Sequence, residues 1–347
     1  MQIELVTVGI IAFIITLLSL PIIRIFALRM GLYDEIEDRK VHKSLTPRIG
    51  GVSIALALVV NILLFVDLSR PAIALMLAAI TLFITGMIDD LFGLKPITKL
   101  LAQIVAAIFV LSGGISILFF NLPFSSALIF LDTWKIPVEI FNLSFTIIPL
   151  ANMFTIGWIV LIINATNLLD GLDGLAAGIS FIAFATLLSL TVGSSGDSLI
   201  LVLAVTMCMS LLAFLSSNFY PARIFMGDSG AYLIGLMMAV LPIYSTVKTT
   251  VGVVVIGVAI VDLAWAVLRR IRKRQSPFKA DRGHIHHRLL DNGIEHRNVV
   301  IIFYLITLIV SITVTMFGLI EAITVLMLAL LFVIVMTKNK KIDKQMQ

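Results

Sequence analysis

Five aspartates lie where long apolar segments of the chain begin or end: Asp89, Asp90, Asp170, Asp173 and Asp228. A charged side chain beside lipid costs free energy, so residues of this kind usually serve a function. Carboxylates that cluster also repel one another and need a cation to offset their charge. Mg²⁺ binds one or two carboxylates and leaves other coordination positions to water and substrate phosphates. The five aspartates therefore predict a Mg²⁺-dependent site for phosphoryl chemistry, with Mn²⁺ as an alternative ion.

Amide side chains accompany two of these carboxylates. Asn164, Asn167, Asp170 and Asp173 recur at every third position of the sequence. Positions three apart share one face of a helix, so the spacing predicts a single polar stripe. The alternative is a set of polar helix ends at the membrane interface, with Asp acting as N-cap. That alternative explains one such motif more easily than three motifs at the same membrane face.

Four of the five histidines fall in one basic loop, residues 269–298. The motif Gly283-His284-Ile285-His286-His287-Arg288 follows a run of Arg and Lys that ends at Arg282. A Zn²⁺ site is one interpretation, but no Cys lies nearby to complete a typical structural zinc site. The positive charges around these imidazole side chains make contact with a phosphate group the favoured interpretation. A positively charged cytoplasmic loop with incidental histidines is the remaining alternative.

Two other segments supply candidate substrate contacts. In the first loop, Lys43 and Arg48 are placed to reach a phosphate. After the seventh apolar segment, Asn218 and Phe225 combine an amide with an aromatic ring, which suits a pocket for a nucleotide base. The alternative for this second segment is simple anchoring of its aromatic residues at the membrane interface.

The composition places all these residues in a membrane protein. Of 347 residues, 60% are hydrophobic and only 13% are charged, and the mean hydropathy is +1.12. A soluble domain carries about 25% charged residues, so this chain has too few to cover a water-soluble globule. The composition also excludes a disordered chain, a coiled coil and a disulfide scaffold. The single cysteine, Cys208, lies inside an apolar run and has no partner for an intramolecular disulfide.

Eleven segments approach the length and hydropathy that a transmembrane helix needs. The sequence therefore predicts an all-α, polytopic membrane protein in which residues 1–347 form one membrane-embedded domain. The predicted spans are 3–28, 49–67, 71–88, 98–118, 151–169, 174–192, 198–216, 229–246, 249–268, 299–317 and 321–337. The apolar region 119–150 is interrupted by prolines and is predicted to form a short interfacial hairpin. A further pair of spans in this region is the alternative, and it would leave the predicted orientation unchanged.

The distribution of basic residues predicts the orientation. The first span has no basic residue before it, and Arg24 and Arg29 follow its apolar run, which places the N-terminus outside. With eleven spans, only Arg70, Lys135 and Lys248 then fall outside. Basic residues mark cytoplasmic loops, so the C-terminus and all five aspartates are predicted on the cytoplasmic side. The net charge of +5 is explained by this bias, and no nucleic acid partner is expected.

Four motifs, in order along nearly the whole chain, resemble the polyprenyl-phosphate N-acetylhexosamine-1-phosphate transferases. They are Asp89-Asp90, Asn164 to Leu175, Phe225 to Gly230 and Gly283 to Leu289. The resemblance implies transfer of GlcNAc-1-phosphate from UDP-GlcNAc to undecaprenyl phosphate, giving undecaprenyl-pyrophosphate-GlcNAc and UMP. It implies a Mg²⁺ cofactor, a homodimer and a place in the bacterial plasma membrane. The product would begin teichoic acid or another cell-surface polysaccharide.

The resemblance also implies a role for each site residue. The catalytic set would be Asp89, Asp90, Asp170 and Asp228, with Asp89 or Asp90 deprotonating or orienting the lipid phosphate. The Mg²⁺ ion would be held by Asn167, Asp170 and Asp228. Uridine would contact Asp173, Asn218 and Phe225. The diphosphate and sugar would contact Lys43, Arg282, His284, His286 and His287, and the substrate-binding set is completed by Arg48 and Asn164.

Two alternatives compete with this function. Phospho-MurNAc-pentapeptide transferases usually carry three consecutive His and a Thr-Pro-Thr-Met-Gly-Gly segment. Here the sequence reads His284-Ile285-His286-His287 and Thr46-Pro47-Arg48-Ile49-Gly50-Gly51, which favours the GlcNAc branch. A secondary transporter is the alternative from another class, but transporters usually bind substrate near the bilayer midplane. Here the charges gather at one face, with Asp262, inside the ninth span, as the exception.

Overall fold

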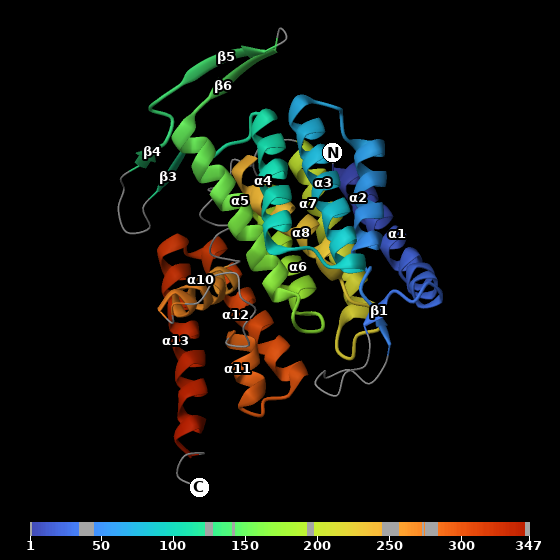
Figure 1. Cartoon of the computed structure of the whole chain (residues 1–347), viewed down its shortest axis with the longest axis vertical. Helices are drawn as coiled ribbons and strands as arrows, with labels where there is room; N and C mark the ends of the chain where they lie inside the picture. The colour runs from blue at the N-terminus through green and yellow to red at the C-terminus, as the bar shows by residue number, and fades with distance from the viewer. Residues whose placement is uncertain are drawn as a thin grey trace.

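The computed structural model describes residues 2–34, 45–121, 128–140, 143–192, 198–244, 257–272, 274 and 284–343. Most of these residues are helical, as Figure 1 shows. The helices are α1 (Gln2–Arg29), α2 (Gly51–Phe65), α3 (Arg70–Phe92), α4 (Pro96–Ser112), α5 (Pro149–Leu169), α6 (Leu175–Thr191), α7 (Ser198–Asn218), α8 (Gly227–Tyr244), α10 (Gly257–Arg272), α11 (Ile285–Asp291), α12 (His296–Met316) and α13 (Leu319–Asp343).

Six helices of the described chain are long and apolar enough to cross a membrane: Glu4–Arg29 of α1, and α3, α5, α7, α8 and α12. Shorter apolar helices are α2, α4, α6 and Leu319–Leu331 of α13. The prediction of a polytopic helical membrane protein is confirmed. The number of eleven spans and the orientation of the termini stay predictions, and the span at 249–268 lies partly outside the described residues.

The predicted interfacial hairpin is a pair of antiparallel hairpins, so the chain is not purely helical. β3 (Phe119–Asn121) pairs with β4 (Leu128–Phe130), and β5 (Ile136–Ile140) pairs with β6 (Leu143–Ile147). Prolines exclude a helix here, and aromatic and β-branched residues favour strands. A third, very short pair joins β1 (Tyr33–Asp34) to β2 (Thr46–Pro47).

Helix α8 lies at the centre of the bundle and is almost entirely buried (Figure 1). It packs against α2, α3, α5, α6 and α7. Small residues permit this close packing, because Gly235 lies against the backbone of Ile163 on α5. Gly86 of α3 likewise lies against the backbone of Ser229. The end of α3 is thereby brought beside the start of α8.

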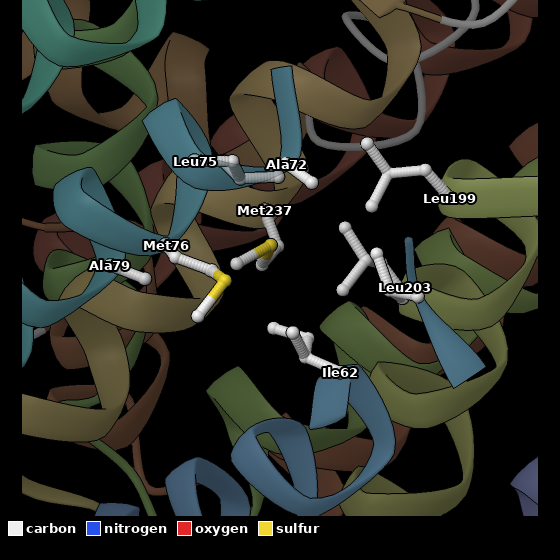
Figure 2. Close-up of a pocket in the computed structure, with 9 residues that line it drawn as sticks. Ile62, Ala72, Leu75, Met76, Ala79, Leu199, Leu203 and Met237 are labelled. Carbon is white, nitrogen blue, oxygen red and sulfur yellow. The ribbon is translucent and has the colours of Figure 1, made fainter. Parts of the chain in front are cut away.

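A small apolar pocket lies where α2, α3, α7 and α8 meet (Figure 2). Its empty volume is about 220 Å³, and its lining includes Ile62, Leu75, Leu203 and Met237. Every residue of the lining is apolar. The pocket therefore offers no group that could hold a phosphate or a cation, and the polar site must be sought at the helix ends.

Candidate active site

The site begins with Asp90, on the last turn of α3. Its carboxylate accepts hydrogen bonds from the backbone N–H of Asp228 at 2.7 Å and of Ser229 at 3.1 Å. These N–H groups belong to the first turn of α8, where a helix has no internal acceptors and carries partial positive charge. Asp90 therefore caps α8 and fixes the position of the neighbouring Asp228.

Asp228 is the hub of the polar cluster. One carboxylate oxygen accepts from the Asn167 amide at 2.9 Å. The other contacts the Lys99 ammonium at 3.1 Å and accepts from the Tyr232 hydroxyl at 3.0 Å. The side chain of Asp228 is 25% exposed. Elements far apart in the sequence, α4, α5 and α8, therefore converge on one accessible carboxylate.

Lys99 joins Asp228 to Asp89. Its ammonium also forms an ion pair with Asp89, whose other oxygen accepts from the backbone N–H of Leu94 at 2.6 Å. Two nearby carboxylates repel each other, and a cation between them offsets that repulsion. Lys99 is not among the site residues predicted from the sequence. The sequence feature that points to Lys99 is its isolation: it is the only charged residue in the predicted span 98–118.

Asp170 follows the last residue of α5 and belongs to the same cluster. Burial raises the pKa of the Asp170 carboxyl well above its ordinary value, and the charges of Asp228 and Asp90 raise it further. The positive charge of Arg48 and the Gly227 backbone N–H act in the opposite direction. A bound cation would offset the part of this rise that comes from the charges of Asp228 and Asp90.

The first loop is fastened to the segment before α8 by backbone hydrogen bonds. Phe225 donates its N–H to Pro47 O at 2.7 Å, and its carbonyl accepts from Gly50 N at 2.9 Å. Gly227 has a φ of +75°, and the carbonyl of Arg48 fills the place that a Cβ would need. Arg48 and Phe225, two predicted substrate contacts, are thereby brought to the edge of the carboxylate cluster.

The predicted polar stripe is helical only in its first half. Asn164 and Asn167 lie on α5, and the Asn164 amide donates to Gln103 Oε1 at 2.7 Å. The helix ends at Leu169, so Asp170 and Asp173 lie in the turn that follows. Asp170 faces the carboxylate cluster, whereas Asp173 has a different set of contacts.

Asp173 and Asn218 bind backbone groups of the two loops around the site. The Asp173 carboxylate accepts from Ala222 N at 2.9 Å. The Asn218 oxygen accepts from Gly174 N at 3.1 Å, and its amide donates to Ile224 O at 2.9 Å. Both side chains are buried. The predicted contact of these residues with uridine stays a prediction.

The histidine motif is organised by Asp262, the exception among charges that otherwise gather at one membrane face. This buried carboxylate of α10 accepts from the backbone N–H of Ile285 at 2.9 Å and lies 3.4 Å from His284 Nδ1. The rings of His284 and His287 are 6.5 Å apart. The short helix α11 that begins here packs against α12 and α13. Asp262 therefore fixes the start of the motif.

Three predicted residues cannot be placed in this geometry. Lys43 and Arg282 lie outside the described residues, as does the side chain of His286. Their predicted contacts with the diphosphate and sugar stay predictions.

The donor chemistry of the cluster suits a hard divalent cation. Within the described ranges, no three His, Cys, Asp or Glu side chains are grouped so as to hold a metal ion. Mg²⁺ needs fewer protein ligands, since it takes one or two carboxylates and keeps water or phosphate at the other positions. Asp228, with the Asn167 amide on one oxygen and Asp170 nearby, provides such a set.

A family model described as glycosyl transferase family 4 matches residues 72–246. This range runs from α3 through α8 and contains Asp89, Asp90, Lys99, Asp170 and Asp228.

The chain belongs to this family. A Bacillus subtilis protein named "Probable undecaprenyl-phosphate N-acetylglucosaminyl 1-phosphate transferase" is 36% identical over 317 residues, which cover 88% of this chain and 83% of that protein. A decaprenyl-phosphate N-acetylglucosaminephosphotransferase of Mycobacterium tuberculosis is 33% identical, covering 87% and 80%. An Escherichia coli K12 undecaprenyl-phosphate alpha-N-acetylglucosaminyl 1-phosphate transferase is 30% identical, covering 85% and 78%.

Proposed function

We propose that this family 4 transferase moves GlcNAc-1-phosphate from UDP-GlcNAc to undecaprenyl phosphate and releases UMP. The observation that carries the proposal is the cluster of Asp89, Lys99 and Asp228 at one end of the helix bundle, within the region that matches the family. A phosphoryl-transfer site acts mainly by positioning its substrates and stabilising charge, which such a cluster is suited to do. The names of the relatives support the choice of donor sugar and lipid acceptor.

In the proposed reaction an oxygen of the lipid phosphate attacks the donor phosphorus that carries the sugar. A new P–O bond forms there, the bond to the bridging oxygen breaks, and UMP leaves with the electron pair. The Lys99 ammonium attracts the lipid phosphate and forms an ion pair with Asp89. The Asp89 carboxylate in turn orients the lipid phosphate or accepts its proton. Asp90 acts through Asp228, because its carboxylate is engaged by the first turn of α8.

The proposed cofactor is Mg²⁺, held by Asn167, Asp170 and Asp228. When bound, it would neutralise the diphosphate of the donor and the repulsion among the carboxylates. The hydrogen bond between Asn167 and Asp228 and the electrostatic interaction of Asp170 with Asp228 support this assignment.

The proposed setting is the plasma membrane of a bacterium, with the carboxylate cluster on the cytoplasmic side. The bias of basic residues toward that side supports the orientation. A soluble nucleotide sugar and a lipid phosphate would meet at this face, and the product would begin teichoic acid or another surface polysaccharide. A homodimer is proposed on the family resemblance alone.

The experiment is a donor competition with purified protein and undecaprenyl phosphate. UMP release is measured with UDP-GlcNAc and with UDP-MurNAc-pentapeptide, each with and without a chelator. We expect UMP from UDP-GlcNAc alone, only when lipid phosphate is present, and none with the chelator. Asp228→Asn provides the inactive control. Turnover of UDP-MurNAc-pentapeptide with no turnover of UDP-GlcNAc would overturn the proposed donor.

A further inference from the structure

Helix α12 forms two hydrogen bonds with the turn that follows α5. The Nε2 atom of His296, the first residue of α12, accepts a hydrogen bond from the backbone N–H of Asp173 at 3.0 Å. Two turns along the same helix, the Tyr304 hydroxyl donates to the carbonyl of Gly174 at 2.5 Å. Residues eight apart lie near one face of a helix, so both groups reach the same turn.

The hydrogen bond of His296 fixes its chemical form. A backbone N–H is always a donor, so Nε2 must be the unprotonated nitrogen of the imidazole. The ring is buried, and it stacks on Tyr220 with centroids 4.7 Å apart and planes inclined by 25°. The imidazole therefore acts as a fixed acceptor that is held in place by the loop before α8.

Tyr304 is fitted to the turn as closely as His296. Its ring lies against Gly178 of α6, where a Cβ would collide with the phenol. Gly174 has a φ of +78°, which a residue with a side chain rarely adopts, and a Cβ there would lie 3.2 Å from the Tyr304 hydroxyl and from the Phe219 ring. The turn and α6 therefore approach α12 this closely because both positions are glycine.

This contact matters because the turn carries Asp170. Helix α5 ends at Leu169, so regular helix geometry no longer sets the position of the Asp170 carboxylate. The contacts from α12, together with that of Asn218 to Gly174, hold the other end of the turn. A shift of the turn would change the distance between Asp170 and Asp228.

We propose that His296, with Tyr304, is a positioning residue that holds the Asp170–Gly174 turn in place for the proposed reaction. Neither side chain contacts substrate in this role. The activity part of the inference rests on the proposed function, whereas the structural part does not.

The structural part is tested by hydrogen–deuterium exchange of the full-length protein in detergent. The Asp173 amide is itself the donor to His296, so a peptide that covers residues 170–176 reports the bond directly. We expect His296→Leu to raise exchange in this peptide at least about threefold, in line with the loss of one hydrogen bond. His296→Gln retains an acceptor near the Nε2 position and should stay within about twofold of the native protein.

Tyr304→Phe is the second test variant, which keeps the inference testable if His296→Leu fails to fold. It keeps the ring that packs on Gly178 and removes only the hydroxyl, so it too should raise exchange at 170–176. Thr313→Val is the matched control, because the exposed Thr313 hydroxyl of α12 bonds only within its own helix at Ile309 O among the described contacts. Exchange at 170–176 that is unchanged in both His296→Leu and Tyr304→Phe would overturn the inference.

The same variants are then assayed for UMP release at varied Mg²⁺. We expect His296→Leu to need at least about threefold more Mg²⁺ for half-maximal activity, with His296→Gln and Thr313→Val near the native value. Equal Mg²⁺ requirements in the native protein and all four variants would contradict a positioning role. Native protein without UMP release would refute the proposed function instead, and the exchange experiment would still decide whether α12 holds the turn.

Discussion

The carboxylate of Asp90 accepts a hydrogen bond from the backbone N–H of Asp228 at 2.7 Å, across 138 positions of sequence. This bond separates the roles of two adjacent aspartates. Asp90 is turned toward α8, whereas Asp89 forms an ion pair with Lys99. Asp90 thus positions the first turn of α8, whereas Asp89 faces the Lys99 ammonium.

The first prediction concerns these two aspartates. Both Asp89→Asn and Asp90→Asn should abolish UMP release, but Asp90→Asn should lower stability more. Its amide keeps one acceptor oxygen for the first turn of α8 but loses the second oxygen and the negative charge, and loss of that charge costs about 0.3–1 kcal/mol of unfolding free energy. Thermal unfolding in detergent measures the difference. Equal loss of stability in the two variants would contradict the separation of roles.

Lys99 is expected to be essential although it lies in an apolar helix. Lys99→Met leaves Asp89 and Asp228 without the ammonium that pairs with both. We expect the rate of UMP release to fall at least about 100-fold, the loss found when a charge-stabilising donor is removed from an active site. Lys95→Met is the control, because Lys95 is exposed just before α4. A Lys99→Met protein with native turnover would remove Lys99 from the site.

Metal dependence should follow the carboxylates of the cluster. A chelator should abolish UMP release, and added Mg²⁺ should restore it. Asp170→Asn should raise the Mg²⁺ concentration for half-maximal activity at least about tenfold, since one proposed carboxylate ligand is lost. Asp291→Asn replaces an exposed carboxylate at the end of α11 and should change nothing. Full activity in the chelator, or native Mg²⁺ dependence in Asp170→Asn, would contradict the assignment.

Asp262 is predicted to act on the donor through the histidine motif. Asp262→Leu removes the acceptor for Ile285 N–H and the carboxylate beside His284, so the motif loses its anchor. We expect the KM for UDP-GlcNAc to rise at least about tenfold. Asp262→Asn retains an acceptor for the N–H group and should lie between Asp262→Leu and the native protein. A native KM in Asp262→Leu would show that the motif does not depend on this anchor.

The sequence revealed the carboxylates because a charge at the end of an apolar span is unusual. Lys99 escaped notice for the opposite reason: at a helix end predicted to be cytoplasmic, a basic residue is what the distribution of loop charges leads one to expect. The capping role of Asp90 depends on tertiary contact with α8, which no local pattern encodes. The spacing of three continued past Leu169 although the helix did not, so the prediction of one helical stripe was wrong for Asp170 and Asp173, which lie in the turn after α5.

The close approach of the first loop to α8 leads to a prediction about glycine. Gly227 precedes Asp228 with a φ of +75°, and a Cβ there would collide with the carbonyl of Arg48 and approach the Asp90 carboxylate. Gly227→Ala should therefore push the first loop away from α8. We expect a stability loss of at least about 1 kcal/mol and at least about tenfold slower UMP release.

The matched control for Gly227→Ala is Gly157→Ala, in the middle of α5. An added Cβ at Gly157 meets no atom within 4 Å, and alanine is the better helix former. Thermal unfolding and UMP release of Gly157→Ala should match those of the native protein. If Gly227→Ala also behaves as the native protein does, the contact between the first loop and α8 does not hold Asp228 in place.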